Sequence, residues 1–151
     1  MPQSLARVVL HIIYSTKHRT PFLRDTEVRA RLHAYMAVVL QGLDCEPILI
    51  NGTEDHVHIL CNFSRTITIA GLIETVKTSP SKWMKEQGPQ YEDFFWQGGY
   101  GVFSISQTDV EGARVYVANQ EAHHRHISFQ DEFRELCRKN GIKVDERYVW
   151  D

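Results

Sequence analysis

The order of strand-like and helix-like segments is the feature that most limits the folds open to this chain. Short runs rich in β-branched and aromatic residues alternate with longer segments whose apolar residues recur at helical spacing. The resulting order is β-α-β-β-α-β-α-α. The first six elements follow the split βαβ, or ferredoxin-like, order, which gives an antiparallel sheet with two helices on one face. We therefore expect an α+β protein of this fold with a helix added near its C-terminus.

The expected elements can be placed on the sequence. Strands are predicted at 5–15, 45–51, 56–63 and at the end of 94–106, and helices at 25–41, 68–78, 108–123 and 128–139. Asn51-Gly52 is the strongest turn signal and is expected to connect the second and third strands. Pro80 is expected to interrupt the second helix, because proline lacks an N–H and clashes with the preceding turn.

Length and composition indicate one globular domain over 1–151. Hydrophobic residues make up 42% of the 151 residues and charged residues 24%, which excludes a disordered or low-complexity chain. No apolar run approaches the ~20 residues that span a bilayer, and we recognise no secretory signal. Cys45, Cys61 and Cys137 form no CxxC pair, so each is expected to be a small buried hydrophobe in a reduced, cytoplasmic protein.

The charge balance excludes a general electrostatic attraction to nucleic acid. Seventeen Lys and Arg against nineteen Asp and Glu give a net charge of −2. Any binding to DNA must therefore depend on local basic patches.

A pair of histidines is the first candidate for chemistry. His56 and His58 flank Val57 in a segment predicted to be a strand. Side chains two residues apart on a strand point to the same face, so the two imidazoles project side by side while Val57 points into the core. This geometry suits two neighbouring ligands of one metal ion. Taken alone, the pair could equally be two histidines on a solvated sheet face.

A tyrosine and a glutamine lie four residues apart in the third predicted helix. Tyr116 and Gln120 therefore share one helix face, and His123 continues the same stripe. Taken alone, this pattern could belong to an ordinary amphipathic helix with a tyrosine at its edge.

If the two faces meet, they combine two imidazole nitrogens, an amide oxygen and a phenol. His56, His58 and Gln120 would hold a hard cation, Mg²⁺ or Mn²⁺, with open positions for two substrate oxygens. The cation would act as a Lewis acid on a phosphodiester. It would also favour the phenolate form of Tyr116, which is a poor nucleophile when neutral.

The two motifs together resemble the HUH single-tyrosine transposases, the insertion-sequence-200-like enzymes of the smallest bacterial insertion sequences. His56-Val57-His58 matches the histidine pair of that family, and Tyr116-x-x-x-Gln120 matches its tyrosine and third metal ligand. Other segments look like the family too: the first strand followed by Lys17-His18-Arg19, the stretch 96–104, the run 119–124 and the closing Tyr148-Val149-Trp150. The resemblance covers essentially the whole chain.

The resemblance implies a mechanism. His56, His58 and Gln120 would hold the divalent metal, and the substrate would be single-stranded DNA with hairpins near the element ends. Tyr116 would attack the scissile phosphate, which gives a 5′-phosphotyrosine link and a free 3′-OH. A second 3′-OH would then rejoin the strands. Transesterification conserves bond energy, so no nucleotide cofactor is implied, and the chain has no P-loop motif.

The resemblance also implies a homodimer. Subunits of this family join their sheets edge to edge, and the tyrosine-bearing helix can complete the active site of the partner. An exposed sheet edge and an added helix favour pairing on physical grounds as well.

Four basic residues are predicted to contact DNA: Lys17, Arg19, Lys77 and Lys82. Lys77 and Lys82 flank Pro80 and lie near Trp83, so that cations and an aromatic ring are interleaved. Phosphate contacts and base stacking of this kind would suit single-stranded DNA. The alternative is a solvated helix end. His123, His124 and His126 could assist near the metal, bind DNA phosphates or be cations at a helix C-terminus, and the last role is expected for His124 and His126. His11 is expected to be a structural or surface residue.

Two other classes of function are a metal-dependent hydrolase and a binding module without catalytic activity. A metallo-β-lactamase-like or histidine-triad hydrolase would need further His or Asp residues after His58, where Ile59, Leu60 and Cys61 stand. A cupin would need an all-β chain. A binding module of the same fold could recognise hairpin DNA or RNA without cutting it, for example as a repressor, and Tyr116→Phe would leave such a protein unaffected.

Overall fold

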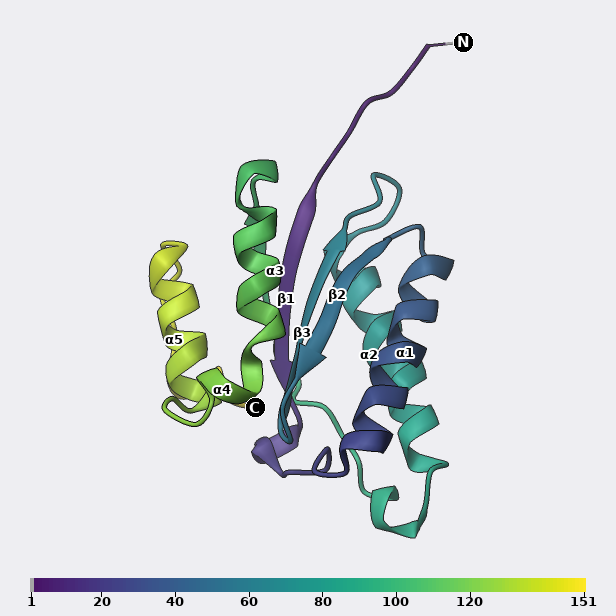
Figure 1. Cartoon of the computed structure of the whole chain (residues 1–151), viewed down its shortest axis with the longest axis vertical. Coiled ribbons are helices and arrows are strands. Elements are labelled where there is room, and N and C mark those ends of the chain that lie inside the picture. The colour runs from purple at the N-terminus through teal and green to yellow at the C-terminus, as the bar shows by residue number, and fades with distance from the viewer. Residues whose placement is uncertain (1) are drawn as a thin grey trace.

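The structure, a computed structural model that describes residues 2–151, is built around one antiparallel sheet (Figure 1). Its strands are β1 (Val9–Ser15), β2 (Pro47–Gly52), β3 (His56–Asn62) and β4 (Gly101–Ile105), in the order β2-β3-β1-β4. The helices are α1 (Thr26–Gly42), α2 (Ile69–Lys85), α3 (Val110–Ala118), α4 (Gln120–His123) and α5 (Phe129–Lys139). Three short 3₁₀ helices complete the chain: η1 (Lys17–Arg19), η2 (Pro89–Tyr91) and η3 (Gln107–Asp109).

The helices cover both faces of the sheet. Figure 1 shows α1 and α2 on one face and α3, α4 and α5 on the other. The strand order and the α1–α2 layer confirm the ferredoxin-like prediction. The second helical layer is the addition expected from the sequence, and it encloses a face that an isolated ferredoxin-like unit would leave open.

Side-chain alternation gives each sheet face its own core. Leu10, Ile12 and Tyr14 of β1 pack with Val57 and other residues against α1 and α2. Ile13 and Phe103 pack on the opposite face with three residues of α5, which are Phe129, Phe133 and Cys137. Residues of β3 that alternate with Val57 must therefore face α3–α5. All three cysteines are buried, as predicted.

Polar side chains cap three helices where the sequence predicts their starts. Asp25 accepts hydrogen bonds from the amides of Glu27 and Val28 at the start of α1. Thr68 accepts one from Gly71 in α2, and Ser128 accepts one from Asp131 in α5. Each cap satisfies N–H groups that have no partner within the first turn.

Two strand predictions are corrected at their ends. β1 begins at Val9 rather than at residue 5, because 5–8 are exposed and the ladders to β3 and β4 both start at Val9. Asn51-Gly52 ends β2 instead of forming the turn, which lies at 53–55. A Cβ on Gly52 would lie 2.2 Å from the His56 carbonyl oxygen, so the glycine permits a close strand approach.

The prediction that Pro80 interrupts the second helix is wrong. α2 continues through Pro80 to Lys85. Proline leaves the carbonyl four residues earlier without its usual donor, and here that carbonyl belongs to Val76. The hydroxyl of Tyr14 lies 3.5 Å from the Val76 oxygen and donates to it, which helps to compensate for the missing bond.

The prediction of one long helix over 108–123 is also corrected. Asn119 has φ −99° and ψ 25°, and it separates α3 from the single turn α4. Asn51 of β2 donates to the carbonyls of Val117 and Ala118 at 2.9 and 3.2 Å. This side chain satisfies the last carbonyls of α3 and fixes the helix end against the sheet.

Within residues 2–151, no helix combines the length and apolar character needed to cross a membrane.

Candidate active site

The site begins with two histidines on β3. His56 and His58 are fully buried beneath α3–α5, while Val57 between them lies in the opposite core. The predicted orientation of the three side chains is confirmed. The solvated sheet face considered above is excluded, because the added helices cover this surface.

Each histidine has a partner on its Nδ1 atom. His56 Nδ1 lies 2.7 Å from Asp55 Oδ1 and 2.9 Å from Thr53 Oγ1. His58 Nδ1 lies 2.7 Å from Nε2 of His11, and the two rings stack with their centroids 5.0 Å apart. Asp55 and His11 can accept the Nδ1 hydrogens, which leaves both Nε2 lone pairs free to bind a metal.

Three further residues bring donor atoms to the same place. Gln120 Oε1 lies 3.2 Å from His56 Nε2. Glu132 Oε1 lies 3.0 Å from His58 Nε2, 3.5 Å from His56 Nε2 and 2.9 Å from His124 Nε2. Gln120 and Glu132 are buried, and His124 is partly buried. These atoms come from β3, α4, the α4–α5 connection and α5.

Tyr116 completes the cluster from the last turn of α3. Its hydroxyl donates to Glu132 Oε2 and lies 3.5 Å from His123 Nε2. Its ring centroid is 5.9 Å from that of His58 and 6.2 Å from that of His11. The helix breaks before Gln120, yet Gln120 Nε2 still lies 3.4 Å from the Tyr116 carbonyl oxygen. In this chain Tyr116 therefore lies beside its own chain's histidines.

Burial controls the protonation of the site. It lowers the pKa of His58 to about 3, against the opposing charge of Glu132, and that of His11 to about 4. Burial alone would raise the pKa of Glu132, but the neighbouring imidazoles of His124 and His58 outweigh it and hold that pKa well below its usual range. Burial and the adjacent Glu132 carboxylate raise the pKa of Tyr116. The result is neutral His11 and His58 beside an ionised carboxylate and a neutral phenol.

The donor set fits a divalent cation. His56, His58, His124 and Glu132 each offer one atom, and these atoms lie within 4.8 Å of one another. Ligands held about 2.1 Å from an octahedral cation lie about 3 Å apart along each edge of the shell, which resembles the separations around Glu132 Oε1. In the tautomers with protonated Nδ1, the Nε2 lone pairs of His56 and His58 converge on carboxylate and amide oxygens. A cation bound among these atoms would offset the repulsion between the nitrogen and oxygen lone pairs.

The structure brings together all four predicted residues, His56, His58, Tyr116 and Gln120, and adds three that sequence reasoning missed. Of the two roles expected for His11, structural or surface, the structure excludes the surface one, since His11 is buried and contacts His58. His124 is drawn into the cluster rather than left at a free helix end. Glu132 could have been predicted from the sequence, because it shares the apolar face of its helix with Phe129, Phe133 and Cys137. A carboxylate on a buried face is rare unless it has a partner, so its position indicates a functional contact.

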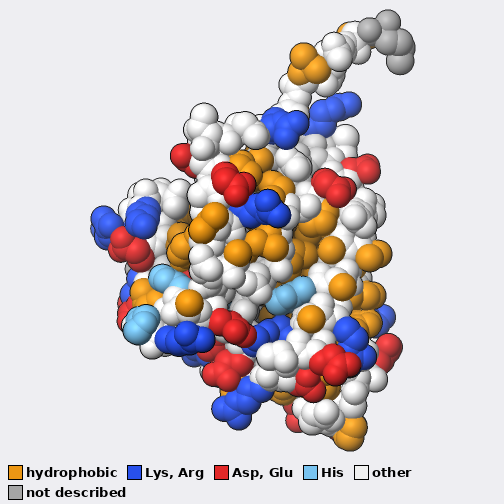
Figure 2. Space-filling model, in the orientation of Figure 1, with side chains coloured by type: hydrophobic (Ala, Val, Ile, Leu, Met, Phe, Trp, Pro, Cys, Tyr) orange, Lys and Arg blue, Asp and Glu red, His pale blue; other side chains and the backbone are white. Residues whose placement is uncertain are grey.

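The predicted DNA-contacting residues lie in different places. Lys77 and Lys82 are on α2, which covers the face opposite the histidines. Lys77 Nζ donates to the carbonyls of Gln97 and Gly99 at 2.7 and 2.8 Å, and burial lowers its pKa to about 8. Lys17 is exposed, whereas Arg19 lines a cleft beside the site. Figure 2 shows acidic and basic side chains interspersed on the face in view, in keeping with the net charge of −2.

A ferredoxin-like sheet that buries an HUH pair beneath a tyrosine-bearing helix defines the class of single-tyrosine HUH proteins. Comparison with protein families gives the particular group: the family model described as "Transposase IS200 like" matches residues 4–120. The chain belongs to this family, which confirms the resemblance seen in the sequence.

Solved structures show the same fold. A Deinococcus radiodurans R1 protein assigned as a transposase is 21% identical, with a TM-score of 0.62 over 80% of this chain and 95% of its own. The structure of a REP-associated tyrosine transposase bound to a REP hairpin is 12% identical, with a TM-score of 0.61 over 84% of this chain and 74% of its own. No curated protein sequence matches the chain closely enough to count as a relative.

Proposed function

We propose that this protein is a DNA transposase that cuts and rejoins single-stranded DNA at insertion-sequence ends. One observation carries the proposal: the Tyr116 hydroxyl contacts a carboxylate that also contacts the Nε2 atoms of His58 and His124. A weak nucleophile is thereby held beside a group of metal ligands, which is the arrangement that tyrosine-mediated phosphoryl transfer requires. Membership of the IS200-like family supports the same chemistry.

The metal would be held by His56, His58 and Gln120, with His124 and Glu132 as further ligands. Oxygen donors from an amide and a carboxylate beside imidazoles suit Mn²⁺ or Mg²⁺ better than a soft metal, and no thiolate is offered by this set. When bound, the cation would supply Lewis-acid polarisation of the scissile phosphate and offset its charge.

The protein's own residues would supply the nucleophile and its orientation. Tyr116 Oη would form a bond to the scissile phosphorus, and the bond to the 3′ oxygen would break, leaving a 5′-phosphotyrosine and a free 3′-OH. Glu132 would hold the hydroxyl toward the cluster. His11 and Asp55 would orient His58 and His56 through their Nδ1 atoms.

The partners follow from the family. Single-stranded DNA with hairpins at the element ends is the proposed substrate, and the hairpin bound by the REP-associated transposase supports it. A cytoplasmic homodimer is proposed too. Tyr116 lies beside the histidines of its own chain, which is the cis arrangement. The trans arrangement implied by the resemblance would require α3 to be exchanged between the two subunits.

Covalent trapping tests the proposal. Labelled single-stranded DNA from the flanking genomic region is mixed with the protein and Mn²⁺, and the products are separated on a denaturing gel. We expect a slow, protease-sensitive band that disappears with EDTA and with Tyr116→Phe. Tyr148→Phe, an exposed tyrosine outside the cluster, is the matched control and should retain the band. If DNA is bound but no adduct forms with any metal, the protein is a hairpin-binding module instead.

A further inference from the structure

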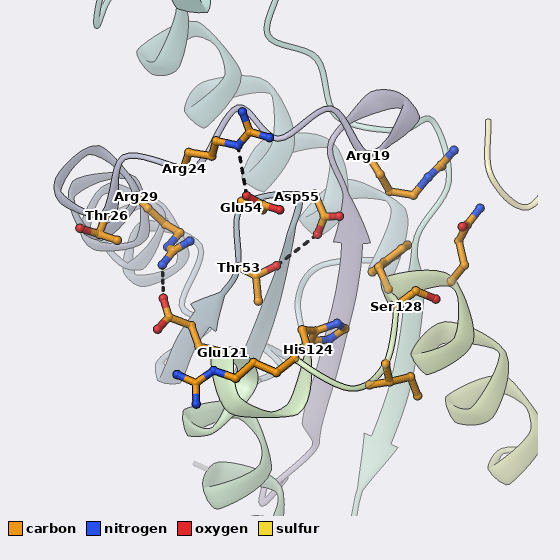
Figure 3. Close-up of a pocket in the computed structure, with 14 residues that line it drawn as sticks. Arg19, Arg24, Thr26, Arg29, Thr53, Glu54, Asp55, Glu121, His124 and Ser128 are labelled. Atoms are coloured by element: carbon orange, nitrogen blue, oxygen red, sulfur yellow. Dashed lines mark hydrogen bonds and ion pairs between the residues drawn. The ribbon is translucent and has the colours of Figure 1, made fainter.

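An arginine-lined cleft opens beside the active site. Its volume is about 470 Å³, and its walls include Arg19, Arg24, Arg29 and Arg125 (Figure 3). The arginines come from η1, the segment before α1, α1 itself and the connection after α4. Three guanidinium groups from residues 19–29 and one from residue 125 thus line one cavity, which favours an anionic ligand.

The cleft and the site share residues. His124 lines the cleft while its Nε2 lies 2.9 Å from Glu132 Oε1. Asp55 also lines it, and its Oδ1 lies 2.7 Å from His56 Nδ1. A phosphate lying in the cleft would therefore adjoin His124, one of the proposed metal ligands.

The acidic residues of the cleft already have partners. Glu54 pairs with Arg24 at 3.3 Å, Glu121 pairs with Arg29, and Asp55 accepts a hydrogen bond from Thr53 (Figure 3). Asp55 also contacts His56. Among residues 2–151, Arg19 and Arg125 have no carboxylate partner. Two guanidinium groups thus remain available for an anion.

The position of Arg19 is set by a strained turn. His18 and Arg19 have φ of 57° and 54°, a left-handed conformation that is unfavourable for residues other than glycine. Thr16 holds the turn: its amide donates to the Asp55 carbonyl at 2.8 Å and its hydroxyl to the Thr20 carbonyl at 2.7 Å. The guanidinium also donates to the Trp150 carbonyl at 3.3 Å. Such a conformation persists only where surrounding contacts enforce it.

We propose that this cleft binds the phosphodiester backbone of the DNA strand that carries the scissile phosphate, with Arg19 and Arg125 as the phosphate contacts. The inference rests on the proposed function, because the identity of the strand follows from the position of the cleft beside Tyr116's cluster. Arg24 and Arg29 are held by carboxylates and shape the walls.

Salt-dependent binding tests the cleft separately from the chemistry. A fluorescent 20-nucleotide single strand is titrated with protein in the Tyr116→Phe background, so that no cleavage occurs. Arg19→Ala with Arg125→Ala should weaken binding about 10-fold near physiological salt. It should also reduce the slope of log affinity against log salt by about 1.4, since each lost phosphate contact on a single strand contributes about 0.7.

A double variant of equal charge is the control. Arg31 and Arg114 are exposed and lie outside the cleft, so Arg31→Ala with Arg114→Ala should change affinity less than twofold. The proposal is overturned if both double variants behave alike, or if the cleft variant loses affinity for a blunt duplex but not for the single strand.

Formation of the covalent adduct distinguishes strand binding in the cleft from the proposed chemistry at Tyr116. With Tyr116 present and DNA saturating, the cleft variant should still form the covalent adduct. If the unmodified protein forms none, the proposed function fails while the salt slopes still decide whether the cleft binds the strand.

Discussion

Glu132 links the two halves of the candidate site. One of its oxygens contacts the imidazoles of His58 and His124, and the other accepts the Tyr116 hydroxyl. An ionised carboxylate with 2% exposure is costly unless it is paired or binds a metal. The residue therefore connects the Tyr116 hydroxyl to the imidazoles of His58 and His124.

Removing the charge of Glu132 should weaken metal binding. Glu132→Gln keeps the shape and an acceptor for Tyr116 but loses a negative ligand, so we expect Mn²⁺ affinity to fall about 10- to 100-fold by calorimetry. Glu135 lies on the same helix, partly exposed and paired with Arg138, so Glu135→Gln should leave the Mn²⁺ affinity unchanged. Equal affinities for the two variants would remove Glu132 from the ligand set.

His11 should act as a positioning residue. His11→Phe keeps a ring beside His58 but removes the atom 2.7 Å from His58 Nδ1. We expect Mn²⁺ affinity to fall about 10-fold, with cleavage restored in part at higher Mn²⁺ concentrations. Unchanged Mn²⁺ affinity would show that the contact only fills space in the core.

Strand and helix periodicity predicted the paired residues but not their neighbours. His56 and His58 follow from a period of two on one strand, and Tyr116 with Gln120 from helical spacing. His11 and Glu132 reach the site from β1 and α5, 47 and 74 residues from His58. No local pattern specifies which distant elements meet, so these contacts required the tertiary structure.

At the scale of elements, α5 is the wall that closes the site. Phe129, Glu132, Phe133 and Cys137 form its buried face, and the apolar three pack on Ile13 and Phe103 of the sheet. The packing of α5 thereby sets the position of Glu132. The order of elements predicted this helix, whereas the Asn119 break depends on the Asn51 contact with the end of α3.

Loss of the α5 cap should destabilise the wall. Ser128→Ala removes the acceptor for the Asp131 amide, and we expect the free energy of unfolding in urea to fall by about 1 kcal/mol. Ser128→Asp retains an acceptor, so its free energy of unfolding should be close to that of the unmodified protein. A loss of the same size in both variants would contradict a capping role.

At the scale of the whole molecule, the sheet is covered on both faces and several histidines are buried. Burial holds the pKa of His11 and His33 near 4 and that of His58 near 3, below the ordinary value of 6.5. His33 Nε2, on α1, has no hydrogen-bond partner within the described residues. At mildly acidic pH these histidines therefore stay neutral in the folded protein, whereas they become protonated in the unfolded chain.

Acid should weaken the fold over a defined range. Between about pH 6.5 and pH 4 the unfolded chain binds protons that the folded chain does not, so stability is fully present above pH 6.5 and falls as the pH is lowered. We expect a loss on the order of 1 kcal/mol or more per histidine in urea unfolding with EDTA. His33→Leu should make the free energy of unfolding less dependent on pH. A free energy of unfolding that stays constant or rises toward pH 4 would contradict this prediction.

Covalent attachment of DNA to Tyr116 is the step on which the proposed function depends. After reaction with single-stranded DNA and Mn²⁺, nuclease and trypsin would leave the peptide 115–125, in which Tyr116 is the only tyrosine. Mass spectrometry should find a nucleotide attached to Tyr116 in this peptide and none in the EDTA sample. A nucleotide on any other residue, or cleaved DNA with no modified peptide, would contradict the account.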